Sequence, residues 1–204
     1  MESPDLVQYY ERRAGEYEAI YAKPERQRDL SLLRKKIPAR LQGRRVLEIA
    51  CGTGYWTALV APAAKSLVAT DLAGEPMKIA LGKNLNARIE RADAYRLPES
   101  LGSFDAALAI FWWSHVPRQR IAEFLVSLHA RLEPGARVLL MDNLYVEGSS
   151  TPVSEVDPRG DTYQQRGKDR VLKNFPTEAE LRSHLPALRY EALRYYWFAE
   201  YELK

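Results

Sequence analysis

The spacing of apolar and polar positions changes along the chain, and each change predicts a type of element. Between residues 45 and 142, short apolar runs that are typical of buried strands alternate with stretches of helical periodicity. The predicted strands cover residues 45–50, 66–71, 87–93, 104–111 and 137–142, and the predicted helices cover 54–63, 74–83 and 117–132. Strands that alternate with helices form βαβ units, a parallel sheet and right-handed crossovers. This region is therefore predicted to be a doubly wound α/β domain.

Helices are predicted before this region, and irregular chain after it. Apolar and aromatic positions predict helices over 4–21 and 25–37, with Pro38 as the stop of the second. Residues 143–175 carry several Gly and Pro, as a functional lid, an insert or a disordered segment would. Thr177 and Glu180 form a capping-box pattern that opens a helix, and the aromatic tail predicts one or two closing strands.

We expect these parts to form one domain over residues 1–204. It consists of a helical cap (1–40), a core that binds the ligand (41–142), the lid or insert (143–175) and the closing helix and strands (176–204). A chain of 204 residues can bury a sizeable core.

The composition is that of an ordinary soluble protein. Hydrophobic residues make up 46% and charged residues 28%, and no apolar stretch approaches the ~20 residues of a membrane span. The first residues lack a basic-then-apolar signal, so we expect a cytoplasmic protein without a membrane partner. The net charge is +3, and basic residues are interleaved with acids, which favours solvated helix faces over a nucleic-acid surface. The single cysteine, Cys51, excludes an internal disulfide framework and a Cys-rich zinc site.

Three features at predicted strand ends indicate a bound nucleotide. Gly52 and Gly54 follow the first strand and let the backbone turn tightly and approach a ligand. Asp71 ends the second strand, where a carboxylate can accept hydrogen bonds from both ribose hydroxyls. Asp93 ends the third, within reach of an adenine amine. Each feature alone has a simpler reading (a tight turn, a helix N-cap, a loop-starting Asp), but their coincidence favours an adenosine ligand.

These motifs resemble one known family. The series Glu48-x-Ala50-x-Gly52-x-Gly54, then Asp71, Asp93-Ala94, FDAALAIFWWSHV and LEPGARVLLMD, is similar to that of the class I S-adenosylmethionine-dependent methyltransferases. The small-molecule group that includes the ubiquinone and menaquinone C-methyltransferases is the nearest in pattern, over residues 5–142. The chain departs from the pattern at Ala50, where many relatives have glycine.

The resemblance implies a fold, a cofactor and a set of binding residues. The fold is a Rossmann-like, doubly wound, mostly parallel seven-stranded sheet with an N-terminal helical cap and an antiparallel C-terminal strand. The cofactor is S-adenosylmethionine. The residues implied to surround it are Tyr10, Tyr17, Gly52, Thr53, Gly54, Asp71, Leu72, Met77, Asp93, Ala94, Ile110, Phe111 and Trp112. Tyr10 and Tyr17 are equally well explained as a stripe that packs the first helix onto the domain.

The chemistry needs little more than alignment of a nucleophile with the activated methyl group. His115, just after the fourth strand, is the candidate general base, although it would also suit a loop-capping role. No metal is predicted, because the Asp142-Asn143 pair lacks a second carboxylate after strand four. Bulky aromatics predict an apolar or aromatic small-molecule acceptor, and four basic residues of the lid allow an anionic group on it: Arg166, Lys168, Arg170 and Lys173.

Two other functions stay open at this point. An NAD(P)-dependent oxidoreductase could use the same glycines and Asp71, although Thr57 stands where its third glycine belongs. A non-catalytic S-adenosylmethionine-binding protein would lack an acceptor cavity. The sequence also allows a homo-oligomer.

Overall fold

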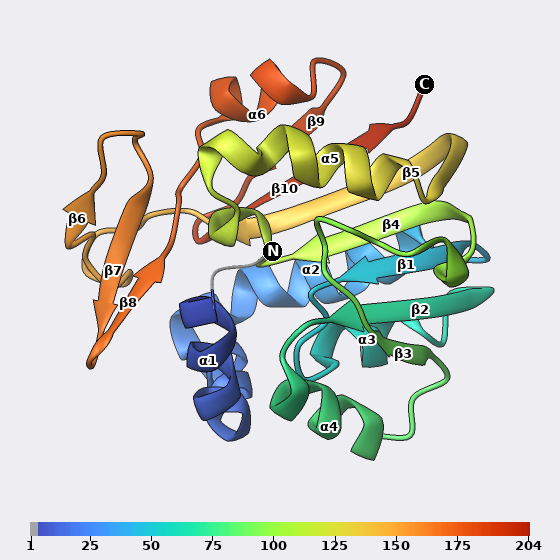
Figure 1. Ribbon diagram of the computed structural model, residues 1–204, viewed down its shortest axis with the longest axis horizontal. Coiled ribbons are helices and arrows are strands. Elements are labelled where there is room, and N and C mark those ends of the chain that lie inside the picture. The colour runs from blue at the N-terminus through green and yellow to red at the C-terminus, as the bar shows by residue number, and fades with distance from the viewer. Residues whose placement is uncertain (1–3) are drawn as a thin grey trace.

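The computed structural model describes residues 4–204, and a seven-stranded sheet forms its centre (Figure 1). The strand order is β3-β2-β1-β4-β5-β10-β9. The strands are β1 (Arg45–Ile49), β2 (Ser66–Asp71), β3 (Arg88–Arg91), β4 (Phe104–Ile110), β5 (Leu132–Asn143), β9 (Arg189–Ala192) and β10 (Tyr196–Glu202). Strands β1 to β5 are parallel, and β10 runs antiparallel to both β5 and β9. The predicted fold class is thereby confirmed.

Side chains alternate between two cores, one on each face of this sheet. In β1, Val46 belongs to one core and Leu47 to the other, as the twofold period of a strand requires. The first core packs the sheet against α2 (Gln27–Arg40) and α3 (Tyr55–Val60). The second packs it against α5 (Ile121–His129) and α6 (Glu178–His184). Both faces are covered, which explains why the central strands read as continuous apolar runs.

Several helix boundaries in the structure differ from the predicted ones, and each difference has a local cause. The helix expected over 4–21 is an α-helix only in α1 (Pro4–Arg13) and continues as 3₁₀ turns in η1 (Ala14–Ala22), where Gly15 disfavours α-helix. The expectation that Pro38 stops the next helix is wrong, because α2 includes it in its last turn and ends at Arg40. The capping box is confirmed: Thr177 accepts from the Glu180 backbone, and Glu180 accepts from the Thr177 backbone.

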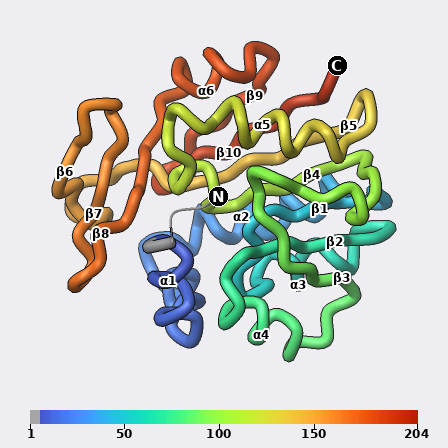
Figure 2. The backbone as a smooth tube through the Cα atoms, viewed as in Figure 1, coloured from blue at the N-terminus to red at the C-terminus, as the bar shows by residue number. Residues whose placement is uncertain are grey.

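The segment 143–175 contains a small sheet of its own. It is built from β6 (Glu155–Val156), β7 (Thr162–Arg166) and β8 (Asp169–Leu172), which pair antiparallel. Figures 1 and 2 show it beside α1, beyond the end of the large sheet. The segment that is rich in Gly and Pro is therefore not disordered throughout, because it contains three short strands.

Helix α1 lies between this small sheet and the core. It packs against β8 on one side and against α4 (Gly74–Gly82) on the other. The Arg12 guanidinium donates to Asp169 in β8 at 2.5 Å, and the Glu11 carboxylate accepts from the Gly74 and Glu75 backbone at the start of α4. Glu11 thus satisfies N–H groups that the helix itself leaves unpaired. None of the helices described in residues 4–204 is both long enough and apolar enough to cross a membrane.

The glycine turn after β1 provides a test of the packing. Gly54 has a φ of 76°, and a Cβ there would lie 3.0 Å from the Ala80 Cβ in α4. We expect Gly54→Ala to lower the free energy of unfolding by about 2–4 kcal/mol, from backbone strain and overpacking together. Gly43 is a matched control, since its φ is 72° but nothing lies within 4 Å of its Cβ position. Urea denaturation that gave equal losses for both variants would contradict the close contact.

Candidate functional site

Two cavities meet at the carboxyl ends of the parallel strands. The sheet-edge cavity lies under α1 at the ends of β1, β2 and β4. Its lining is formed by Leu6, Val7, Tyr10, Tyr17, Ala50, Gly52, Asp71, Ala73, Pro76, Ile110, Phe111, Trp112 and His115. The cationic cavity lies beyond it, between η1, the small sheet and β10. It shares Tyr10, Tyr17, Phe111 and His115 with the sheet-edge cavity, so these four side chains form the wall between the two.

The backbone is strained where it borders the sheet-edge cavity. Ala50 and Phe111 have φ values of 54° and 58°. These values lie in the left-handed region, which residues other than glycine rarely adopt. Both residues follow strands that are neighbours in the sheet, β1 and β4. Backbone strain of this kind concentrates at functional sites. The departure from the family pattern at Ala50 thus falls on a position whose conformation suits glycine.

The Asp71 carboxylate organises the loops around the sheet-edge cavity. Its Oδ2 accepts from the Gly52 backbone at 2.8 Å, and its Oδ1 accepts from the Leu72 and Ala73 backbones at 2.8 and 2.9 Å. Burial raises the pKa of Asp71, and these three hydrogen bonds oppose that rise. Asp71 is the only lining residue of this cavity that carries a formal charge at neutral pH, among the residues the structure describes. The alternative reading of Asp71 as a helix N-cap does not fit, because Glu11 takes that role for α4.

The structure brings only part of the predicted cofactor set to this cavity. Tyr10, Tyr17, Gly52, Asp71, Ile110, Phe111 and Trp112 line it. The remaining six are not among its lining residues: Thr53, Gly54, Leu72, Met77, Asp93 and Ala94. Thr53 donates to Glu18 at 2.7 Å, Gly54 packs against α4, and Asp93 accepts from the Tyr95 backbone at 3.0 Å. Their roles toward a ligand stay predictions.

His115 lies in the wall and is held in one tautomer. Its Nδ1 faces the Leu172 carbonyl at 2.7 Å, which only accepts, so Nδ1 carries the proton. Its Nε2 then accepts from the Tyr10 hydroxyl at 2.8 Å. Burial, followed by the positive charge of Lys173, lowers the pKa of His115 to about 3. Burial keeps the pKa of Tyr10 well above 10, so this hydroxyl stays a donor.

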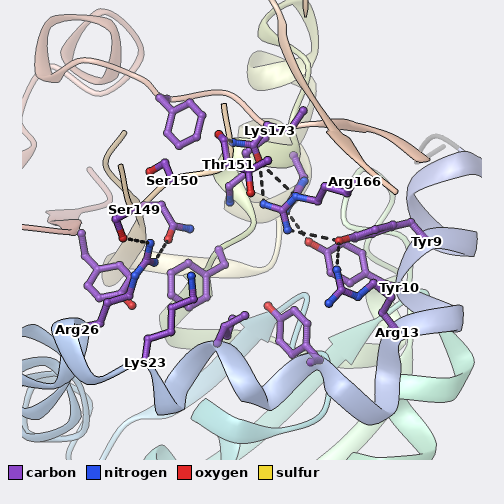
Figure 3. Close-up of a pocket in the computed structure, with 18 residues that line it drawn as sticks. Tyr9, Tyr10, Arg13, Lys23, Arg26, Ser149, Ser150, Thr151, Arg166 and Lys173 are labelled. Carbon is purple, nitrogen blue, oxygen red and sulfur yellow. Dashed lines mark hydrogen bonds between the residues drawn. The ribbon is translucent and has the colours of Figure 1, made fainter. Parts of the chain in front are cut away.

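The second cavity is lined by cations without an acidic partner in its wall. Five basic side chains face it, from the end of α1, the chain between η1 and α2, the small sheet and the residue that follows β8: Arg13, Lys23, Arg26, Arg166 and Lys173. Figure 3 shows them around the cavity with Tyr9, Tyr10 and the hydroxyls of residues 149–151. No Asp or Glu among the described side chains, those of residues 6–204, lines it. The cavity therefore carries a positive potential.

Two of these cations have a carboxylate partner that does not line the cavity. Lys173 contacts the buried Asp142 carboxylate at 3.0 Å and donates to the Ser114 hydroxyl at 2.6 Å. Burial raises the pKa of Asp142, but the charge of Lys173 and the hydrogen bonds from the Ser114 and Asn143 backbones together help to bring the pKa below its ordinary value. Arg13 lies 3.6 Å from Glu16. For Lys23, Arg26 and Arg166, by contrast, no carboxylate lies within 4.0 Å across the described part of the chain.

Several residues of the site were not foreseen from the sequence. Lys23 and Arg26 come from one stretch before α2 and Asn143 from the end of β5, and only the fold brings the two parts of the chain together. Glu11 gave no signal, because an acid near the N-terminus reads as a solvated helix face. Arg166 and Lys173 were foreseen as basic residues of the lid, and both line the cavity. Lys168 and Arg170, foreseen with them, lie in the small sheet away from the lining, and Arg170 pairs with Glu155 at 2.7 Å.

Comparisons with known proteins agree with this geometry. Residues 46–135 match a family model described as a methyltransferase domain. The chain is 24% identical to a malonyl-[acyl-carrier protein] O-methyltransferase of Serratia marcescens, over 89% of this chain and 66% of that protein. It is 28% identical to a demethylmenaquinone methyltransferase of Clavibacter sepedonicus, over 72% of this chain and 58% of that protein. The chain thus spans less than two thirds of the length of these curated relatives.

A solved structure is similar over nearly the whole chain. The complex of DhpI with S-adenosylhomocysteine superposes with a TM-score of 0.78 and 26% identity, and the match covers 96% of this chain and 94% of that one. The predicted family and the predicted cofactor class are both confirmed by these findings. Residues 46–135 thus form a methyltransferase domain, and the chain as a whole is similar to S-adenosylmethionine-dependent methyltransferases.

Proposed function

We propose that this protein transfers the methyl group of S-adenosylmethionine to a small-molecule acceptor that carries an anionic group. One observation supports this most directly: the sheet-edge cavity and the cationic cavity share a wall of four side chains, Tyr10, Tyr17, Phe111 and His115. A donor in the first and an acceptor in the second would face each other across that wall. A non-catalytic binding protein would have no use for the second cavity.

The lining of the sheet-edge cavity fits the cofactor. When bound, S-adenosylmethionine supplies a methyl group on a sulfonium, which leaves its bonding electron pair on sulfur. Trp112 and the two tyrosines of the wall offer aromatic faces to such a cation. Asp71 accepts three backbone hydrogen bonds and has one lone pair left, on Oδ2, to accept from a ribose hydroxyl. An NAD pyrophosphate fits less well, because the one formal charge in the lining is a carboxylate.

The lining of the cationic cavity indicates the acceptor. Burying charge is costly unless an opposite charge compensates it. The three cations without a carboxylate partner would be compensated by an acceptor with one or two negative charges. Ile20, Phe175 and Tyr196 also line this cavity, so an apolar or aromatic portion of the acceptor, as the sequence predicts, has surfaces to contact.

His115 is the proposed base where the acceptor has a proton to lose. It is neutral, and its Nε2 lone pair points into the wall between the cavities, where the Tyr10 hydroxyl now binds it. An acceptor O–H or N–H that replaces this hydroxyl would give its proton to Nε2. Tyr10 would then be free to orient the acceptor. Alignment of the reactants by the wall would supply the larger part of the rate.

The first prediction concerns the cofactor. S-adenosylhomocysteine at 100 times its Kd adds about 2.7 kcal/mol of stability, which raises the Tm of a chain of this size by roughly 5–11 °C. NAD is expected to give no shift. In Asp71→Asn the affinity for S-adenosylhomocysteine should fall about 10- to 100-fold, because an amide nitrogen cannot accept from a ribose hydroxyl.

The matched control for this variant is Asp105→Asn. Asp105 accepts from the Arg45 backbone at 2.8 Å, at the opposite end of the parallel strands. Its substitution removes one charge but should leave S-adenosylhomocysteine binding unchanged in calorimetry. A Tm shift with NAD alone would refute the proposed donor and favour the oxidoreductase.

The second prediction concerns the pH dependence of stability. Because the pKa of His115 is lowered to about 3, the unfolded chain binds a proton that the folded chain does not between pH 3 and the ordinary His value of about 6.5. Stability therefore falls as the pH drops below about 6.5, and His115 alone should cost about 2 kcal/mol between pH 7.5 and pH 5. In His115→Gln that part of the loss should vanish, whereas the exposed His184→Gln should keep it. Parallel slopes for wild type and His115→Gln in urea melts would show that this imidazole is not buried neutral.

The third prediction concerns catalysis. With any acceptor that loses a proton, His115→Gln should lower kcat by about 100-fold, the lower end of the usual contribution of a general base, because an imidazole with a pKa of about 3 is a weak base at pH 7. Binding of S-adenosylhomocysteine should change little, since His115 contributes only part of the wall. An acceptor screen over phosphorylated and carboxylated small molecules, followed by release of S-adenosylhomocysteine, provides the assay. Full activity of the variant at pH 7 would eliminate His115 as the base.

A further inference from the structure

We infer that Arg26 is the centre of a subsite that binds an oxyanion of the acceptor, a carboxylate or a phosphoryl group, away from the atom that is methylated. The inference rests on the proposed function, because it concerns the acceptor in the cationic cavity. It adds where the negative charge is held and by which groups.

Arg26 is a buried cation without a counter-ion. Arg26 directly precedes α2 in the chain, and only 8% of the residue is exposed. Its Nη1 donates to the Asn143 side chain at 3.0 Å and its Nη2 to the Ser149 hydroxyl at 3.4 Å, and its Nε has no hydrogen-bond partner. The guanidinium lies over the rings of Tyr195 and Tyr196, at 5.4 and 5.6 Å from their centroids. Neutral partners and aromatic faces hold the group in place but leave its charge unbalanced.

The acids nearest to Arg26 in the sequence form no ion pair with it. Asp29 is buried and accepts from the Tyr195 backbone at 2.8 Å. Glu25 is exposed and accepts from the Ser149 hydroxyl at 3.5 Å. Neither carboxylate lies within 4.0 Å of the Arg26 nitrogens in the described chain. A guanidinium that is nine-tenths buried in this way is costly unless a bound anion compensates it.

The surroundings of Arg26 are donors. A guanidinium has five N–H groups, and the two neutral partners use only two of them. The side chains of Ser149, Ser150, Thr151 and Lys23 line the same cavity. The Ser150 hydroxyl accepts from the Val146 backbone at 2.9 Å, which leaves its own O–H to donate. Hydroxyl, ammonium and guanidinium groups are the donors that bind carboxylate and phosphate oxygens.

This subsite lies apart from the shared wall. Figure 3 shows Arg26, Lys23 and Ser149 at one side of the cavity, and Tyr9, Tyr10 and Arg13 at the other. Methyl transfer would occur beside Tyr10 and His115, which border the sheet-edge cavity. An acceptor held by Arg26 therefore presents a different group to the methyl donor. The structure favours acceptors with an anionic end and a separate nucleophilic end over acceptors whose anchored oxyanion is itself methylated.

The test uses the full chain saturated with S-adenosylhomocysteine. Inorganic phosphate and acetate are titrated in separate arms by calorimetry at constant ionic strength, and the arm that gives saturable heat identifies the oxyanion chemistry. We expect Arg26→Gln to weaken that binding about 10- to 100-fold. Arg28→Gln is the control, because Arg28 is exposed, lies two residues away and makes the same change of charge. Ser149→Ala should weaken binding less and serves where Arg26→Gln fails to fold.

The outcomes separate this subsite from the proposed function. Loss of anion binding in Arg26→Gln but not in Arg28→Gln, with S-adenosylhomocysteine still bound, supports the subsite. Equal anion binding in wild type and Arg26→Gln, or a loss produced only by Arg166→Gln, overturns it and leaves the methyltransferase proposal intact. No binding of S-adenosylhomocysteine to the wild type counts against the proposed function instead.

Discussion

The buried Asp142 carboxylate is the interaction on which the rest of the site depends. It ends β5 and accepts from the Ser114 backbone, from the Asn143 backbone and from the Lys173 ammonium. These bonds join three separate pieces of chain: the loop after β4, the end of β5 and the chain that returns from the small sheet. An ion pair that is fully buried contributes less to stability than to fixing one arrangement, because its desolvation offsets much of its attraction. Here it fixes the loop that carries Trp112 and His115 next to the cationic cavity.

The same carboxylate also orders the more distant cations. The Asn143 side chain donates to Asp142 and accepts from Arg26, so the position of Arg26 follows from that of β5. Burial, followed by the charge of Lys173, lowers the pKa of His115 and keeps the imidazole neutral, whereas the charge of Asp142 acts in the opposite direction. The buried Asp142 carboxylate thus sets the placement of Lys173 and of the donors beyond it. Hydrogen bonds in such networks strengthen one another, so the loss of one member weakens the others.

The sequence predicts the core better than the site, and the reason is physical. Strands β1, β2 and β4 could be placed because each is buried by its own apolar run, and Asp71 because it directly follows one. Arg166 could not be brought together with Lys23 and Arg26, since nothing local relates it to residues well over a hundred positions earlier in the chain. The small sheet was missed because its strands are short and polar, and the left-handed Phe111 because a bulky residue gives no sign of such a conformation.

Helix α1 connects the two halves of the site by charge. Its Glu11 holds the start of α4 beside the sheet-edge cavity, and its Arg12 holds β8 beside the cationic cavity. Because α1 and η1 carry the tyrosines of the shared wall, opening of these contacts would move that wall. Exposed ion pairs weaken as salt screens them, so the attachment of α1 to the small sheet through Arg12 and Asp169 would loosen as the ionic strength of the medium rises.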